Sequence, residues 1–199
     1  NNILAKLTEI ISNMANLATE NTLGLIKVKI DKLTFDSGNN LNITGTTSSN
    51  WETGTALGRG FIVTTDDITL RPKSETAVLF IKNPSGSGKA MRLNKLLAGA
   101  SDKTSAIMRV YLNPTITSSG TALAINGLKS GNISAMQAFQ LPTVSAKGTE
   151  LDSVRYTSAG RELDYGLGFY IQPGESILLT LQLDSHDSGD TLSVTWLEE

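Results

Sequence analysis

The hydrophobic period of the chain changes near Gly24. The apolar residues before it are separated by steps of 4, 3, 4 and 3 residues: Ile3, Leu7, Ile10, Met14 and Leu17. This spacing keeps apolar side chains on one stripe of a helix with 3.5 residues per turn, as in a coiled coil. After Gly24 the apolar residues alternate with period two, which is typical of β-strands. We therefore expect a short oligomerising helix followed by an all-β body, as in many fibrous and spike-like assemblies.

The expected helix runs from Ile3 to about Glu20. In heptad terms Ile3, Ile10 and Leu17 take the d positions, and Leu7 and Met14 take the a positions. Isoleucine at d with leucine at a favours more than two strands, so we predict a homotrimer. The alternative is a single amphipathic helix that packs on its own domain.

The composition excludes several classes of protein. The chain has 199 residues, of which 39% are hydrophobic and 18% charged, enough apolar content for a core and too little charge for a disordered chain. The net charge of −2 gives no basic face for nucleic acid. No apolar run is long enough to span a membrane, and the absence of cysteine excludes disulfides and thiolate metal sites. The first residue is Asn, which indicates a chain that begins mid-protein or after processing.

The β body predicts an antiparallel, jelly-roll-like β-sandwich. Short alternating or apolar runs are separated by turns rich in Gly, Pro, Asn and Asp. We expect an oligomerising helix at 1–24, a β-rich linker or small β region at 25–71, and the sandwich at 72–199. Within the second region, Gly45–Gly60 is predicted to be a loop.

Individual strands have distinct patterns. Thr76–Lys82 is nearly continuous in apolar residues, which predicts a strand buried on both faces. Ser176–Leu183 and Thr191–Leu197 alternate, which predicts one buried face each. The turn at Asp187–Asp190 between these two runs has the residues of a hairpin.

No motif supports catalysis. Ser85–Lys89 superficially resembles a phosphate-binding loop, but the glycine five residues earlier and the hydroxyl after the lysine are missing, so a solvated hairpin is favoured. His186 is the only histidine, and the nearby Asp184, Asp187 and Asp190 could hold a hard cation, but an ordinary hairpin explains them better. We predict no metal and no cofactor.

The sequence lacks the signatures of two hydrolase mechanisms. A Ser–His–Asp triad would need His186, and no nucleophile elbow is present. A glycosidase would need two neighbouring carboxylates, and the repeats of a polysaccharide-cutting β-helix are absent. The candidate carboxylates are Asp66, Asp67, Glu150, Asp152, Glu162 and Asp164. We therefore predict that the chain is not an enzyme.

Aromatic side chains could stack on a sugar. The candidates are Trp51, Tyr156, Tyr165, Tyr170 and Trp196. Trp196 alternates with Val194, which predicts a core position. Trp51 lies in a polar segment and is the best candidate for an exposed ligand contact, although packing of its own loop is the favoured explanation.

Four segments together resemble the β domains of tailed-phage virion proteins, described as head fibres, decoration proteins or tail-fibre components. They lie within Thr76–Glu199 and occur in a characteristic order: Leu79–Lys89, Arg109–Leu123, Tyr170–Ser176 and Leu192–Glu199. The resemblance implies a virion-surface structural protein that is trimeric and has no catalytic residues. The segment from Asn1 to Gly60 resembles nothing that we can name.

Two functions follow as hypotheses. The first is a homotrimeric head fibre or decoration protein that is anchored in the virion through its N-terminal helix and contacts other virion proteins. The second is a receptor-binding adhesin that contacts a host surface glycan or protein. Its recognition loops would be Gly45–Gly60, Thr115–Thr121 and Gly127–Ser134, because loops on a rigid β scaffold often carry recognition.

Overall fold

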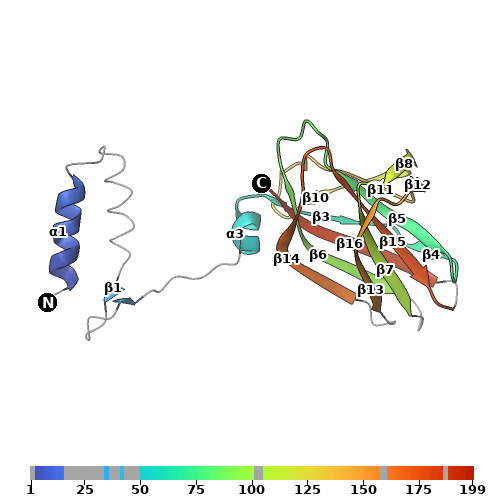
Figure 1. Cartoon of the computed structure of the whole chain (residues 1–199), viewed down its shortest axis with the longest axis horizontal. Coiled ribbons are helices and arrows are strands. Elements are labelled where there is room, and N and C mark those ends of the chain that lie inside the picture. The colour runs from blue at the N-terminus through green and yellow to red at the C-terminus, as the bar shows by residue number, and fades with distance from the viewer. Residues whose placement is uncertain are drawn as a thin grey trace. The chain divides into compact units, whose positions relative to one another are not determined.

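The structure is a computed structural model that describes residues 3–15, 34–35, 41–42, 50–100, 105–156, 161–185 and 188–199 (Figure 1). The chain divides into two compact units, Asn1–Thr47 and Ser48–Glu199. The first unit contains helix α1 and a pair of two-residue antiparallel strands: α1 (Ile3–Ala15), β1 (Thr34–Phe35) and β2 (Leu41–Asn42). The predicted helical turns after Ala15 and most of the predicted strand at Leu25–Phe35 lie outside the described residues.

The second unit is mainly β, as predicted. It begins with the short helix α3 (Asn50–Ala56). Its strands are β3 (Gly60–Thr64), β4 (Ile68–Leu70), β5 (Glu75–Lys82), β6 (Met91–Ala100), β7 (Ala106–Leu112), β8 (Thr115–Ser118), β9 (Thr121–Leu123), β10 (Asn126–Gly127), β11 (Gln137–Gln140), β12 (Thr143–Ala146), β13 (Thr149–Tyr156), β14 (Arg161–Ile171), β15 (Ser176–Leu183) and β16 (Ser188–Glu198). In the described part of the chain all pairings between these strands are antiparallel.

Two main sheets have the strand order of a jelly roll. Sheet I has the order β10-β3-β16-β6-β14, with β4 also paired to β16, and sheet II has the order β13-β7-β15-β5-β11-β9. Eight strands of the two main sheets correspond to those of a jelly roll. In chain order they are β3, β5, β6, β7, β13, β14, β15 and β16. Sheet I takes the first, eighth, third and sixth of these, and sheet II takes the second, seventh, fourth and fifth. This interleaving is that of a double-sheet jelly roll, which confirms the predicted fold class.

Two sequence predictions about this body need correction. β3 and β4 belong to sheet I, so the sandwich begins before Pro72, where the sequence placed its start. The segments Ser85–Lys89 and Asp187–Asp190 were predicted as hairpin turns, but the strands on either side of each do not pair, because β5 and β15 lie in sheet II whereas β6 and β16 lie in sheet I. Asp190 itself lies inside β16, opposite Ala100.

The core lies between the two sheets. The alternating side chains of β15 and β16 enter it as predicted, and Ile177, Leu179 and Trp196 are fully buried. The rings of Trp196 and Phe61 stack with centroids 6.1 Å apart. Burial of such side chains is the main stabilising contribution to a sandwich, at about 25 cal/mol per Å² of apolar surface.

A second apolar cluster covers the outer face of sheet II. Phe80, Tyr111 and Leu178 are buried there, and Ile116 and Val144 pack against them from above. Strand β5 is therefore buried on both faces, as its continuous apolar run predicted, because Leu79 faces the main core and Phe80 faces this outer cluster.

The cover of this cluster is a two-stranded ribbon that we call the strap (residues 113–120 and 141–148). The antiparallel pair β7–β13 continues beyond sheet II as the pair β8–β12, and then as β9–β11, which rejoins sheet II on the far side of β5. Figure 1 shows β8 and β12 outside the two main layers. β8 and β12 were not expected from the sequence pattern.

The strap turns away from the sheet through left-handed residues at each end. Asn113 has φ 53° and Gly148 has φ 85° at one end, whereas Leu141 has φ 52° and Gly120 has φ 83° at the other. A Cβ atom on Gly148 would lie 2.1 Å from the carbonyl oxygen of Leu112, and one on Gly120 equally close to that of Gln140. Both bends therefore require glycine.

Candidate functional site

The apolar stripe of α1 is the predicted association site. Ile3 and Ile10 are 50% and 54% exposed, and Leu7 is half-buried. Met14 lies in α1, but its side chain is outside the described part of the structure, as is Leu17. Two of the five predicted seam residues, Ile3 and Ile10, thus expose large apolar side chains on the surface of α1. They are seven residues apart, which is the heptad repeat of a coiled coil.

The opposite face of α1 is polar or small. Ala5, Glu9 and Ser12 are exposed there, and the exposed Lys6 flanks the stripe. Thr8 donates a hydrogen bond from its hydroxyl to the carbonyl oxygen of Leu4, one turn earlier. α1 is therefore amphipathic in the sense required for either association or packing, and no helix in the described ranges is long and apolar enough to cross a membrane.

Trp51 does not lie in a loop. It is in α3, within the segment Gly45–Gly60 that was predicted to be a loop, and its side chain is half-buried. α3 packs close to β16 at Gly54, where a Cβ atom would lie 2.5 Å from Leu197 Cδ1. The helix was missed because it is only seven residues long and contains two threonines and a glycine. A ligand contact of Trp51 stays a prediction.

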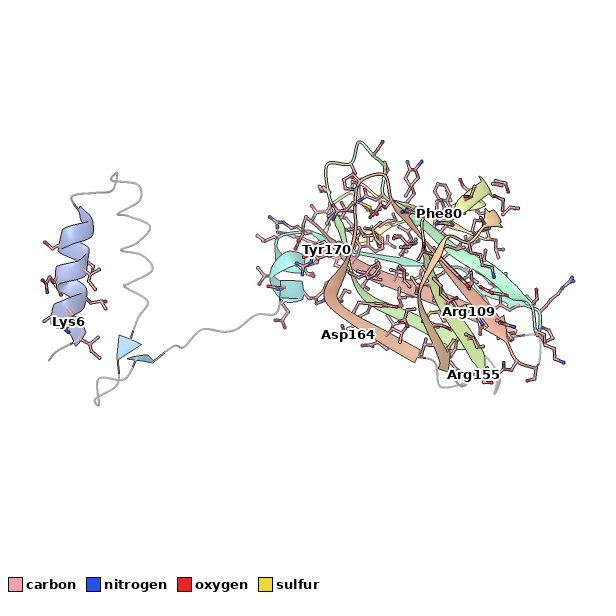
Figure 2. All side chains as sticks on the ribbon, viewed as in Figure 1. Lys6, Phe80, Arg109, Arg155, Asp164 and Tyr170 are labelled. Carbon is pink, nitrogen blue, oxygen red and sulfur yellow. The ribbon has the colours of Figure 1, made fainter. Side chains whose placement is uncertain are left out.

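The other aromatic candidates are mostly internal. Trp196 and Tyr156 are buried, and Tyr165 donates a hydrogen bond to Asp152 Oδ2 over 2.9 Å. Burial, with the neighbouring Asp152, raises the pKa of Tyr165. Tyr170 is 45% exposed, and the guanidinium carbon of Arg92 lies 4.8 Å from the centre of its ring. Tyr170, labelled in Figure 2, is therefore the candidate with the most accessible ring.

The segment Ser85–Lys89 is held by a buried asparagine. Asn83 donates from Nδ2 to the carbonyl oxygens of Lys89 and Ile171, over 2.8 and 2.9 Å, and accepts from Ser87 Oγ over 2.6 Å. Lys89 Nζ lies 3.5 Å from Glu198 Oε2. These groups serve the connection between the sheets, and a strand, β6, follows it where a phosphate loop would have a helix.

Glu198 is a fully buried carboxylate that fixes the loop before β11. Its Oε1 accepts from Trp196 Nε1 over 3.3 Å and from the Ser134 hydroxyl. The Ala135 N–H donates to both oxygens, over 3.2 and 3.1 Å. With Lys89 as its cation, the charge of Glu198 is compensated inside the protein.

Glu75 is the centre of a second polar cluster, on the outer face of sheet II beside the strap. Its Oε1 accepts from the hydroxyls of Tyr111 and Thr180, over 2.9 and 2.7 Å. Its Oε2 lies 2.5 Å from Lys147 Nζ and 3.5 Å from an Arg109 guanidinium nitrogen. Figure 2 labels Phe80 and Arg109, which mark the apolar and polar parts of this face.

The titration of this cluster reflects its hydrogen bonds. Burial raises the pKa of Glu75, but the bonds from Lys147, Thr180 and Tyr111 outweigh burial and leave the pKa below its usual value. Burial, followed by the hydrogen bond to Glu75, raises the pKa of Tyr111. The carboxylate is therefore ionised, and its acceptor capacity is largely used within the protein.

The predicted carboxylate candidates do not gather into one site in the described part of the molecule. Asp66 exchanges two hydrogen bonds with Gln140, Asp152 binds Tyr165, and Glu162 pairs with Lys95. Among the described residues no group of three or more acidic or histidine side chains is placed to hold a metal ion. His186 and Asp187 lie outside the described residues.

Comparisons with known proteins do not identify a family. No protein-family model matches the chain, and no curated protein shows a significant match. A solved structure of infectious bursal disease virus, Gx strain, aligns with 70% of this chain and 40% of the viral chain, at 15% identity and a TM-score of 0.16. This chain therefore spans less than half the length of that viral chain, and so low a TM-score carries no argument about fold or function.

Proposed function

We propose that this chain is a structural protein of a phage virion, a homotrimeric head fibre or capsid decoration protein. The observation that carries the proposal is the combination of an amphipathic helix, whose Ile3 and Ile10 are half exposed, with a jelly-roll body. Jelly rolls are frequent in viral capsid proteins and lectins. The four segments that resemble phage β domains agree with this assignment, and a helix that joins three copies would suit a surface fibre.

The test is the solution mass of the chain and of a seam variant. Light scattering coupled to size exclusion is expected to give about three times the chain mass of 21.2 kDa. In the double variant Ile3→Asp/Ile10→Asp the mass should fall to one chain, because six carboxylates would meet in the seam of a trimer. The matched control, Ala5→Asp/Ser12→Asp, places the same charges on the opposite face and should remain trimeric.

Two outcomes would refute a homotrimer that α1 holds together. One is a wild-type mass of a single chain at every concentration measured. The other is a seam variant that keeps the mass of the wild type, as the control does, which would show that the copies associate through another surface.

The second candidate is a receptor-binding adhesin. The observation in its favour is the loop that follows β10, whose Ile133 is 89% exposed although the loop is held by Asn132, which donates to the carbonyl oxygen of Gly58. A loop that a rigid β scaffold holds in place is the kind of segment that often carries recognition. Binding of host-cell glycans or of receptor protein, lost in Ile133→Ser, would favour an adhesin over a decoration protein.

A further inference from the structure

A cleft of about 370 Å³ lies beside the strap, on the outer face of sheet II. On the sheet it is lined by residues of β5 and β15, and on the strap by a continuous run of residues. The lining consists of Glu75, Ala77, Leu178, Thr180 and the six residues from Pro142 to Lys147. Its size is within the range of ligand-binding sites in proteins.

The cleft lies along an edge of the strap. β12 pairs with β8 with register shifts on both sides of Val144, so its side chains do not alternate strictly between the two faces. Here every residue of β12 contributes, and no residue of its partner β8 does. The cleft therefore runs along the edge of β12 that faces away from β8.

That edge has backbone groups available for pairing. β12 pairs with β8, and in the described part of the chain no other strand pairs with it. The edge is also held in position from the other side. The Thr117 hydroxyl donates to the carbonyl oxygen of Thr143 over 3.1 Å, and the Ser145 hydroxyl to that of Thr115 over 3.2 Å. A fixed edge loses little conformational entropy on binding.

The ends of the edge limit what can pair with it. Pro142, which is buried and has no N–H, precedes β12, and Lys147, tied to Glu75, follows it. Proline and lysine at strand edges restrict pairing with other chains. The available edge is therefore the four residues of β12, or about 13 Å at the rise of a strand.

The other walls of the cleft do not suit a sugar. The Glu75 carboxylate already accepts from two hydroxyls and from Lys147, so little capacity remains for sugar hydroxyls. No aromatic residue lines the cleft, and the nearby rings of Phe80 and Tyr111 are buried in the outer cluster. What remains is a strand edge above a floor whose accessible apolar side chain is the half-buried Ala77, because Leu178 is fully buried.

We propose that β12 accepts an extended peptide segment of another polypeptide, which adds a third strand to the strap. Main-chain hydrogen bonds to β12 would provide the affinity, and alternate side chains of the segment would contact the floor of the cleft. The floor favours uncharged, small or β-branched side chains at those positions, because the half-buried Ala77 offers them no polar partner.

The test uses the full chain and synthetic hexapeptides labelled with fluorescein. Alternate positions of the peptides vary among Ala, Val, Thr and Leu, and the parent is Thr-Val-Thr-Ala-Thr-Val. Saturable binding is expected by fluorescence anisotropy, with amide shifts at Thr143–Ala146 in nitrogen-15 spectra. Methylation of alternate backbone nitrogens of the peptide should weaken binding about tenfold or more, because it removes the donors that a strand edge pairs with.

A protein variant tests the place of binding. Ala77→Phe fills the floor and should weaken binding to a similar extent, whereas Thr64→Phe, at an exposed position of β3, should not. The N-methylated peptide leaves the protein unchanged, so the result stands even if Ala77→Phe fails to fold. Absence of saturable binding across the peptide set would overturn the proposal. So would binding that N-methylation does not affect, or shifts of the same amides by a panel of saccharides but by no peptide.

Discussion

At the scale of single residues, Glu198 connects three parts of the sandwich. It is fully buried at the end of β16, and it binds the indole of Trp196, the loop at Ser134–Ala135 and the ammonium of Lys89. A buried charge is tolerated when its partners compensate it, and removal of one member leaves the others without partners. The side chain thus couples the core to the connection between β5 and β6.

Glu198→Ala is therefore expected to destabilise the protein by about 3 kcal/mol, because the Trp196, Ala135 and Lys89 donors lose their acceptor. Chemical denaturation followed by tryptophan fluorescence measures the change. Glu199→Ala is the matched control, since this neighbouring carboxylate is exposed and pairs with Arg92 at the surface. It should cost about 1 kcal/mol or less. Equal losses in the two variants would show that burial of Glu198 has no special role.

The core residues were predictable from the sequence, whereas these polar residues were not. Alternation in β15 and β16 placed Ile177 and Trp196 in the core because period two is a local property of a strand. The partners of Glu198 lie 63 residues away at Ala135 and 109 residues away at Lys89. Such contacts depend on which strands become neighbours, and a single sequence does not carry that information.

At the scale of elements, the strap depends on Glu75. Lys147 follows β12 and binds Glu75 of β5, while Thr180 of β15 and Tyr111 and Arg109 of β7 bind the same carboxylate. The strap is thus tied to sheet II by a charge as well as by the apolar cluster below it. Its attachment should depend on the ionisation of Glu75.

Acid is therefore expected to loosen the strap. The pKa of Glu75 in the folded protein lies below the usual value of 4.5. A lowered pKa stabilises the fold above the unfolded value, and this contribution disappears as the pH falls through the folded value. Amide hydrogen exchange at Thr143–Ala146, measured from pH 6 to pH 3, should accelerate more than the exchange of β15 after correction for intrinsic rates.

Glu75→Gln provides the control. The amide keeps the shape and can still accept from Tyr111 and Thr180, but it has no charge to lose. Its strap should exchange faster than the wild type at pH 6 and show little further change toward pH 3. The same acid-induced acceleration in wild type and variant would exclude Glu75 as the group responsible.

The strap and α3 were the elements that the sequence did not predict. The side chains of β8 and β12 are mostly exposed, so neither strand has the alternation that marks a half-buried strand. Their left-handed ends are visible as Gly120 and Gly148, but Asn113 and Leu141 supply the other two bends, and leucine is not expected in that conformation. Because only the turn residues of the strap stood out in the sequence, its strands β8 and β12 were not distinguished from loops.

At the scale of the whole molecule, the jelly roll explains why turns were predicted better than connections. The turn at Pro173–Gly174 and the predicted turn at Ser85–Lys89 are both present, but each joins a strand of one sheet to a strand of the other. Gly, Pro, Asn and Asp indicate where a chain reverses. They do not indicate whether the next strand pairs with the previous one or crosses to the opposite sheet.

The division into two units predicts that residues 48–199 fold without the helix. This unit contains both main sheets, the core between them and the strap. A truncated chain that begins at Ser48 should therefore keep the cooperative unfolding transition of the sandwich in denaturant. Its solution mass should fall to that of one truncated chain, because the proposed seam residues Ile3, Leu7 and Ile10 have been removed. A truncated chain that folds but stays trimeric would place association in the jelly roll. One that fails to unfold cooperatively would show that the sandwich needs the first unit.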